Sequence, residues 1–200
     1  TMLSESDLLR MMREEVDHPA TARELARLLR IPREWRARLT RHLRSLVKSG
    51  SLVEVRGGRF GLPDRMNLIV GRVSTNPRGF AFVDPESPGP DDPQTVFIAG
   101  NNLNQAVHGD RVVVRIEHRR EPERAEGRIL RILARGTDRI VGRYEQDRAG
   151  RGFLVPFDRR LTIDVQIASG QTMGAASGEM VTVEILEWPT PTRPALGRII

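Results

Sequence analysis

The sequence contains no cysteine among its 200 residues, a single lysine and only 4% aromatic residues. The absence of cysteine excludes a disulfide framework and a thiolate metal site, and a reducing cytoplasmic setting is the simplest expectation. The apolar runs are short, and none approaches the roughly 18 residues that a membrane-spanning helix needs. The N-terminal residues TMLSESDLLRMM carry acidic side chains and no basic stretch before an apolar core, which is not the pattern of a signal peptide. We therefore expect a cytoplasmic protein with no membrane partner.

Positive charge is abundant although lysine is scarce. Lysine and arginine together number 32 against 26 acidic residues, the formal net charge is +6, and the pI is about 11.1. A pI above roughly 9 makes nucleic acid a leading partner hypothesis. Lys48 is the one lysine, so the charge is carried by guanidinium groups, which suit phosphates and base planes. Genome composition explains the same bias equally well.

The first 63 residues predict three helices followed by a β-hairpin. Apolar residues recur at helical spacing over 5–16, 21–31 and 33–49, and the second of these segments opens with the capping box TARE. The runs SLVEVR and RFGL flank Gly57 and Gly58, which is typical of a hairpin turn. This order of elements predicts a winged helix.

The predicted third helix carries a basic face opposite its buried side. Such a face can enter a nucleic-acid groove, and arginines beside the hairpin turn can contact phosphates. A solvated surface on a small packing module explains the same residues equally well. The candidate contacts are Arg36, Arg41, Arg44 and Lys48 on the helix and Arg56 and Arg59 beside the turn.

The rest of the chain is an internal repeat. Four motifs recur in the same order: VGRV at 70 with VGRY at 141, RGF at 78 with RGF at 151, HGDRVVVRI at 108 with SGEMVTVEI at 177, and EGRI at 126 with LGRI at 196. Each copy consists of short β-type runs broken by Gly, Pro, Asn and Asp. We therefore expect two small antiparallel barrels in tandem.

The stretch PRGFAFV places two phenylalanines one residue apart. Because side chains alternate on a strand, Phe80 and Phe82 share one face with Arg78, while small and aliphatic residues that suit a barrel interior take the other. In the stretch QTVFIA the same alternation turns Phe97 outward. We predict an exposed platform of three rings flanked by Arg72 and Arg78, on which unpaired bases stack while guanidinium groups hold the backbone. The alternative, in which some of these rings fill the barrel, stays open.

The second copy has fewer aromatic residues on the corresponding face. Arg151, Phe153 and Val155 share a side of their strand, Tyr144 lies nearby, and no aromatic residue in LTIDVQI corresponds to Phe97. We therefore expect Arg151, Phe153 and Tyr144 to contact RNA more weakly, or mainly to hold geometry.

No catalytic constellation occurs in the sequence. The four histidines are scattered without metal-ligand spacing, and neither a GxSxG motif nor a Walker-type loop is present. The stretch His108-Gly109-Asp110 is interpreted as a turn before the strand RVVVRI. We predict no catalytic residue, no metal site and no cofactor in this chain.

Several of these motifs together resemble a known family. RGFAFV and TVFIA resemble the two ribonucleoprotein motifs of cold-shock domains, with Phe80 and Phe82 at the aromatic positions of the first motif and Phe97 at that of the second. LTRHLRSLVKSGSLVEVRGGRFGLP resembles the N-terminal winged helix of the ribonuclease R family, and the order of modules extends the likeness over essentially all 200 residues. The implied fold is α+β and mainly β: a winged helix at 1–63, a first cold-shock or OB barrel at 66–135, and a second at 138–200 that ends within or just after its last strand.

The resemblance implies a function for the family. Its members are processive, magnesium-dependent 3′ to 5′ exoribonucleases, in which the cold-shock domains guide single-stranded RNA to a separate catalytic domain. The magnesium-binding aspartates lie downstream of the second barrel, so we expect this chain to bind RNA without cutting it. Structured RNA or a protein is the expected partner of the winged helix. The alternatives are a non-catalytic RNA-binding or chaperone-like protein and a winged-helix DNA-binding regulator.

Overall fold

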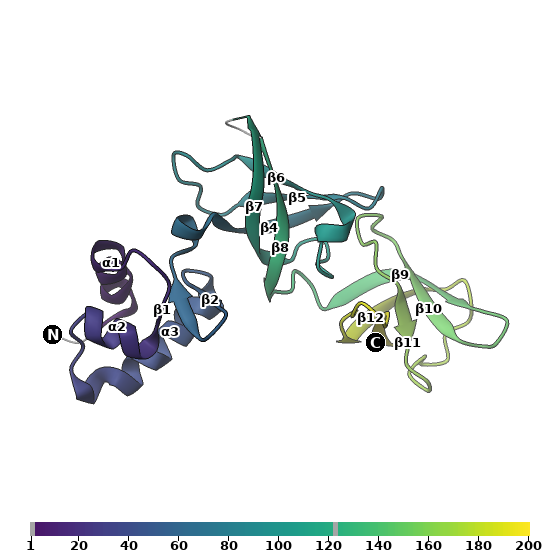
Figure 1. The fold of residues 1–200 in the computed structure, drawn as a ribbon. Helices are drawn as coiled ribbons and strands as arrows, with labels where there is room; N and C mark the ends of the chain where they lie inside the picture. Colours follow the sequence, from purple (N-terminus) through teal and green to yellow (C-terminus); the bar gives the residue numbers. More distant parts are fainter. Residues whose placement is uncertain (1–2, 122–123) are drawn as a thin grey trace.

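The chain folds into three parts that lie in a row (Figure 1). The structure, a computed structural model, describes residues 3–121 and 124–200. An N-terminal helical region is followed by a first barrel in the middle and a second barrel at the other end (Figure 1). Each part has its own cluster of buried apolar side chains. The predicted fold class, a mainly β chain with two closed five-stranded barrels after a helical region, is confirmed.

The N-terminal region combines helices with a small antiparallel sheet. The helices are α1 (Glu5–Glu15), α2 (Ala22–Leu28) and α3 (Arg36–Ser49), with a 3-10 turn η1 (Arg33–Trp35) before α3. The sheet has the order β1-β3-β2 and consists of β1 (Ala20–Thr21), β2 (Val53–Val55) and β3 (Arg59–Gly61). The sequence did not predict β1, because two residues are too few to show an alternation of apolar and polar side chains.

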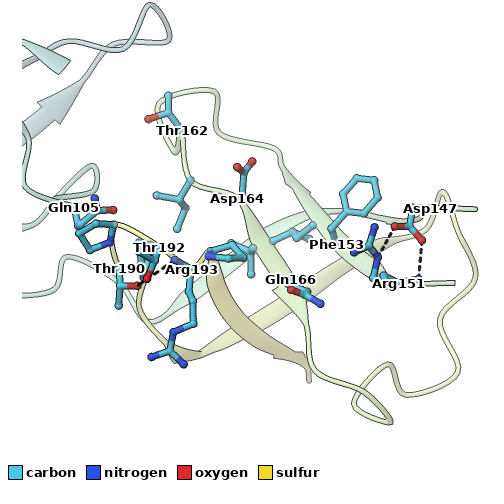
Figure 2. A pocket seen from close by; sticks show the side chains of 17 residues that line it. Gln105, Asp147, Arg151, Phe153, Thr162, Asp164, Gln166, Thr190, Thr192 and Arg193 are labelled. Carbon is cyan, nitrogen blue, oxygen red and sulfur yellow. Dashed lines mark hydrogen bonds and ion pairs between the residues drawn. The ribbon is translucent and has the colours of Figure 1, made fainter. Parts of the chain in front are cut away.

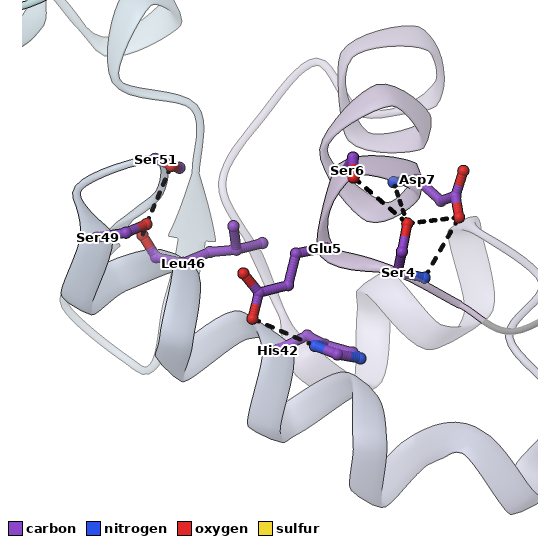
Figure 3. Close-up of polar contacts among 8 residues, drawn as sticks. All are labelled: Ser4, Glu5, Ser6, Asp7, His42, Leu46, Ser49 and Ser51. Carbon is purple, nitrogen blue, oxygen red and sulfur yellow. Dashed lines mark hydrogen bonds and ion pairs between the residues drawn. The ribbon is translucent and has the colours of Figure 1, made fainter.

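Capping residues fix where the helices begin and end. The Glu24 amide donates to the Thr21 hydroxyl at 3.2 Å, and the Thr21 amide donates to the Glu24 carboxylate at 2.8 Å, which is the capping box expected from TARE. Ser4 and Asp7 form the same arrangement at the start of α1 (Figure 3). Helix α3 ends at Gly50, which has a φ of 80°, a left-handed conformation that glycine adopts readily.

The apolar faces of the helices form the core of this region. Leu8 of α1, Leu25 of α2 and Leu43 of α3 are fully buried in one cluster. At the edge of that cluster, Nδ1 of His42 lies 3.4 Å from the Glu5 carboxylate and connects α3 to α1 (Figure 3).

The first barrel follows the short 3-10 turn η2 (Pro63–Met66). Its strands are β4 (Leu68–Thr75), β5 (Ala81–Pro85), β6 (Thr95–Ile98), β7 (Arg111–Glu121) and β8 (Arg124–Ala134), in the closed order β4-β5-β6-β8-β7, with η3 (Gly100–Asn102) after β6. Neighbouring strands are antiparallel except for β6 and β8, which are parallel.

The interior of the first barrel is filled by small and β-branched side chains. Ala81 and Val83 of β5 and Val96 and Ile98 of β6 are fully buried, as the alternation of these strands predicts. The next residue along each strand therefore faces outward.

The second barrel repeats this topology strand for strand. The pair β11 and β13 is parallel, as β6 and β8 are in the first barrel. The strands are β9 (Arg139–Gln146), β10 (Gly152–Pro156), β11 (Val165–Ile167), β12 (Met180–Glu187) and β13 (Ala195–Ile199), in the closed order β10-β11-β13-β12-β9.

The glycine of the repeated VGR motif lets the first two strands of each barrel approach closely. A Cβ on Gly71 would lie 2.3 Å from the Asp84 carbonyl oxygen, and a Cβ on Gly142 would lie 2.3 Å from that of Val155. No other residue fits such an approach. Gly71 and Gly142 thus occupy equivalent places, and each residue of β4 corresponds to the residue of β9 that lies 71 positions later in the chain.

The N-terminal region packs against the outside of the first barrel. Val53 of β2 is buried in one cluster with Leu68 of β4 and Val113 of β7. Arg111 of β7 adds a polar contact, because it donates to the Ser49 carbonyl at 2.5 Å and to the Glu86 carboxylate at 2.7 Å. The outer face of β4 and β7 is therefore a docking face for the helical region.

Candidate nucleic-acid interface

Three phenylalanine rings gather on the outer face of the first barrel. The ring centroids of Phe80 and Phe82 are 5.8 Å apart, those of Phe80 and Phe97 are 5.6 Å apart, and those of Phe82 and Phe97 are 5.8 Å apart. These are the spacings of mutually contacting aromatic rings. Phe82 is 40% exposed, and the other two rings are half-buried. The three side chains, which we call the aromatic platform, present ring surface to solvent as expected from alternation.

The backbone holds the platform through one strand pair and one tight turn. Phe82 lies directly opposite Phe97 in the pairing of β5 with β6. Phe80 precedes β5, where its carbonyl accepts from the Asn76 amide at 2.7 Å and closes a turn in which Gly79 has a φ of 94°. That positive φ favours glycine and brings the chain back toward β4.

The two arginines predicted beside the platform lie in different places. Arg78 sits in the turn before Phe80 with an exposed side chain. Arg72 donates from its guanidinium to the Gly109 carbonyl at 3.1 Å, on the side of β4 that pairs with β7. The structure therefore places Arg78 in the turn that leads into Phe80, and Arg72 across β4 from the rings.

The second barrel repeats the turn with different side chains. Just as the Asn76 amide donates to the Phe80 carbonyl, the Asp147 amide donates to the Arg151 carbonyl at 3.0 Å. Arg151 therefore occupies the place of Phe80, and Phe153 that of the second ring of the platform. The sequence prediction aligned RGF at 78 with RGF at 151, which is wrong by two residues. Because side chains alternate with a period of two along a strand, this error leaves every side chain on its expected face.

The place of Phe97 is taken by a polar residue. Gln166 of β11 lies opposite Phe153 of β10, as Phe97 lies opposite Phe82 in the first barrel. Both side chains face outward, Phe153 with 39% of its surface exposed. The second barrel thus keeps one ring of three, as the lack of a further aromatic residue predicted.

Tyr144 does not belong to this surface, and its assignment as an RNA contact was wrong. Its side chain is fully buried in the core of the second barrel, in the place that Val73 has in the first. Its hydroxyl accepts from the Gln146 side chain at 2.8 Å, and a Cβ on Gly152 would lie 2.5 Å from its ring. Because Arg143 faces outward, its neighbour on the strand faces inward.

A cleft of about 610 Å³ runs along the β10–β11 face of the second barrel. Arg151 and Phe153 lie at one end, and Gln105 of the first barrel lies at the other (Figure 2). Between these ends are Asp164 and Gln166, which are exposed and have no hydrogen-bonded partner for their side chains among the described residues. Other polar lining residues come from the segments 162–164 and 189–194, with the side chains of Thr162, Thr190, Thr192 and Arg193.

The two barrels are joined by a buried carboxylate and a stacked arginine. Asp110, 1% exposed, accepts from the Val107 amide at 2.8 Å, from the Gly136 amide at 3.0 Å and from the Arg135 guanidinium at 2.8 Å. The same guanidinium lies 4.2 Å from the ring centroid of Trp188 in the second barrel. We call these contacts the junction.

A second set of contacts lies near the junction. The Thr75 hydroxyl donates to the Arg160 carbonyl, and the Thr75 amide donates to Nδ1 of His108 at 3.3 Å. Burial lowers the pKa of His108, the charge of Arg160 lowers it further, and Asp158 partly offsets these effects. Hydrogen bonds from Arg160 lower the pKa of Asp158 to about 2.

The predicted basic residues of the N-terminal region are all on its surface. Successive residues of a helix are 100° apart, so Arg41, Arg44 and Lys48 form one stripe on α3 and Arg36 lies to one side of it. The turn between β2 and β3 has Gly57 and Gly58 at φ values of 82° and 65°, as the hairpin prediction requires. Exposed side chains are those of Arg36, Arg41, Arg44, Lys48, Arg56 and Arg59.

The sequence analysis missed a further group of basic residues. Strands β7 and β8 form a long hairpin that extends beyond the first barrel (Figure 1). The loop between the fourth and fifth strands of an OB fold is a recurrent oligonucleotide contact. Arg128 is paired with Glu117 at 3.2 Å, and Arg119 donates to the Asp91 carbonyl at 2.5 Å. Exposed arginines of this hairpin include Arg115, Arg119, Arg124, Arg128 and Arg131.

Residues 3–121 and 124–200 contain neither a cluster of metal ligands nor a membrane-spanning helix. No three His, Cys, Asp or Glu side chains gather there in a way that could hold a metal ion. In the same residues, no helix has the length and apolarity to cross a bilayer.

Family models and relatives match most of the chain. Residues 71–132 match the Ribonuclease B OB domain, and residues 153–200 match the Cold shock domain. The chain is 36% identical over 185 residues to ribonuclease R of Escherichia coli, which covers 92% of the chain and 22% of that protein. Ribonuclease R of Acidithiobacillus ferrooxidans is 31% identical over 189 residues, which covers 94% of the chain and 42% of that protein. The chain thus spans about a fifth to two fifths of the length of these relatives.

Solved structures share the fold at low sequence identity. The apo form of Mycoplasma genitalium RNase R matches with a TM-score of 0.56 and 14% identity, over 66% of this chain and 21% of that one. The same enzyme in complex with ribose methylated single-stranded RNA matches equally well. Yeast Ssd1, a pseudonuclease, matches with a TM-score of 0.53 and 16% identity, over 68% of this chain and 23% of that one.

Proposed function

We propose that the chain, an N-terminal region of the ribonuclease R type with OB domains, binds single-stranded RNA and guides it to a catalytic domain outside this chain. The observation that carries the proposal is the aromatic platform. Three contacting rings on the outside of a barrel offer bases a surface for stacking, which is sequence-tolerant because every base has a π-face. A relative of the same fold has been solved with single-stranded RNA, which supports the same ligand here.

Charge on the two barrels holds the RNA backbone. Arg78 is adjacent to the platform, and Arg72 lies across β4 from it. On the second barrel Arg151 contacts the RNA backbone, and the ring of Phe153 stacks on a base. Arg151 is ion-paired with Asp147 at 2.7 Å, so the net positive charge at that place is lower and phosphate contact is weaker there than at Arg78.

The N-terminal region is a winged helix that contacts structured RNA or a protein. Its helices, its sheet and its exposed basic stripe support this assignment. The domains divide at 1–63, 66–135 and 138–200, in accordance with three separate cores. The site residues of this region are Arg36, Arg41, Arg44, Lys48, Arg56 and Arg59.

The hydrolytic step belongs to the part of the protein outside this chain. Nuclease chemistry of the ribonuclease R type uses magnesium ions, which acidic side chains of a catalytic domain would hold. The protein acts in the cytoplasm, which the absence of cysteine supports.

Fluorescence anisotropy of the chain with single-stranded RNA, the matching single-stranded DNA and a duplex DNA tests the proposal. The chain is expected to bind the single strands more tightly than the duplex, and to lose affinity as salt is raised. Phe82→Ala is expected to weaken RNA binding by about 5- to 150-fold, because stacking of one base contributes about 1 to 3 kcal/mol.

Phe157→Ala is the matched control. Phe157 is 78% exposed and lies outside the platform and the cleft, so its loss is expected to leave RNA affinity unchanged. Tightest binding to the duplex, with no effect of Phe82→Ala, would contradict the proposal and assign nucleic-acid binding to the N-terminal region.

A further inference from the structure

The faces of the two barrels differ in chemistry at equivalent positions. Where the first barrel has Phe80 and Phe97, the second has Arg151 and Gln166, while a ring remains at Phe153. A platform of three rings accepts any base by stacking. A face with one ring beside an amide and a carboxylate can stack one base and also form hydrogen bonds to its edge.

We propose that the cleft of the second barrel binds one unpaired nucleotide and selects a base with an exocyclic amino group over uracil, through Gln166 and Asp164. This inference rests on the proposed function, because it assumes that single-stranded RNA is the ligand of both barrels. It adds base selection, which stacking on three phenylalanine rings does not supply.

The geometry brings a stacking surface and polar groups together. Phe153 and Gln166 are directly opposite in an antiparallel pair, a relation in which Cβ atoms lie about 4.5 to 5.5 Å apart. Asp164 lies two residues before Gln166, and both side chains are exposed while Val165 between them is buried. A base stacked on Phe153 therefore has its edge beside Gln166, with Asp164 next along the same face (Figure 2).

The polar groups determine which edge fits. An ionised carboxylate only accepts hydrogen bonds, so Asp164 favours an amino group and disfavours the O4 carbonyl of uracil. The Gln166 amide both donates and accepts, so it can bond the adjacent ring nitrogen and exocyclic group of adenine, cytosine or uracil and place that edge beside Asp164, which supplies the preference. Since neither side chain has a hydrogen-bonded partner among the described residues, both are available to a ligand.

The cleft also limits how many nucleotides take part. The segment 189–194 and Gln105 of the first barrel close the end opposite Arg151 (Figure 2). Its volume of about 610 Å³ falls within the range of small-molecule sites, roughly 300 to 1,000 Å³, and suits one nucleotide.

Binding of C10 and U10 RNA oligomers to the chain tests this inference by anisotropy. Cytosine and uracil share a pyrimidine ring and differ in the amino or carbonyl group at C4, so stacking contributes similarly to both. We expect C10 to bind about fivefold tighter than U10, the lower end of what one good pair of hydrogen bonds to a base edge supplies.

Three variants separate base selection from binding. Gln166→Phe restores the pair of rings found in the first barrel and removes the amide that places the base edge beside Asp164, so U10 affinity is expected to rise and the preference to fall. Asp164→Asn introduces a donor, which is expected to reduce the preference. Phe82→Ala, in the first barrel, is expected to weaken C10 and U10 by the same factor.

The possible failures are distinguishable. Equal affinity for C10 and U10 in a chain that binds both would overturn the inference and leave the proposed function standing. A preference that survives Gln166→Phe and Asp164→Asn would also overturn it, because selection would then lie elsewhere. Absence of binding to either oligomer would refute the proposed function and the inference together.

Discussion

Replacement of Asp110 by alanine should destabilise the first barrel and loosen the contact between Arg135 and Trp188 of the second. The carboxylate is 1% exposed and accepts three hydrogen bonds, from the amides of Val107 and Gly136 and from Arg135. Its loss leaves two amides without an acceptor, one of them in the interior. Arg135 loses its charge partner, so its position on the Trp188 ring is then held by its bond to the Gln105 carbonyl at 3.2 Å and no longer by Asp110.

The magnitude follows from the number and type of bonds. One hydrogen bond to a charged group contributes about 1.5 to 3 kcal/mol, and breaking a buried ion pair by removing one partner costs about 3 to 5 kcal/mol. The guanidinium of Arg135 is 22% exposed and can be hydrated in the variant, which argues against a simple sum of three bonds. We therefore expect Asp110→Ala to lower the free energy of unfolding of the first barrel by about 3 to 5 kcal/mol.

Amide hydrogen exchange measured by NMR reads out the first barrel separately from the other cores. Val112 and Val114 of β7 are fully buried and belong to its core, so their exchange should report opening of that barrel. A loss of about 3 to 5 kcal/mol corresponds to roughly 10²- to 10³-fold faster exchange or more. Emission of Trp188 in a Trp35→Phe background should change as well, because its contact with Arg135 is no longer held in place.

The second barrel offers a matched control. Glu179 occupies the place of Asp110, since its carboxylate accepts from the Ala176 amide at 2.9 Å, but it is exposed. Glu179→Ala is expected to cost no more than about 1 kcal/mol. Unchanged exchange of Val112 and Val114 in Asp110→Ala, together with unchanged Trp188 emission, would refute the role given to the junction.

Two further predictions concern the second barrel and the response to pH. Tyr144→Ala should lower the free energy of unfolding of the second barrel by about 3 to 5 kcal/mol in chemical denaturation, whereas Tyr144→Phe, which loses only the bond from Gln146, should cost about 0.5 to 1.5 kcal/mol and leave RNA affinity unchanged. The pKa of His108 is lowered in the folded state, so folding favours its neutral form. The stability linked to that neutral form is fully present above about pH 6.5 and declines as the pH falls below that value. The nearby Asp158, with a pKa of about 2, stays ionised over this range. Thermal unfolding between about pH 7.5 and 5.5 should show this decline in the natural chain and less of it in His108→Gln; an equal decline in both would assign the effect to other groups.

Local patterns in the sequence were sufficient to predict the barrels and the platform. The motifs VGR and GRI recur, and HGD is matched by SGE, at points where glycine is needed for close approach or a turn, so their order predicted the repeat. Alternation alone placed Phe80, Phe82 and Phe97 outward, because a strand offers a side chain only two faces.

Other features depend on relations that no short pattern carries. The true equivalence of Arg151 with Phe80 depends on a turn closed by backbone hydrogen bonds, and the identical letters RGF pointed to a register two residues away. Tyr144 was misplaced because its aromatic ring suggested a stacking surface, whereas the outward position of its neighbour Arg143 turns it inward. Gln166 carries no motif at all, and only its pairing with Phe153 brings it into the cleft.

The separate cores of the two barrels have an evolutionary consequence. Both copies keep glycine at the close approach of their first two strands, at Gly71 and Gly142, so the backbone of each is subject to the same restriction. The outward residues on the second and third strands belong to neither buried cluster, so a substitution there alters the surface of one barrel and leaves the core residues of both in place. A duplicated unit of this kind lets selection keep one general RNA-holding surface while the other acquires a new preference.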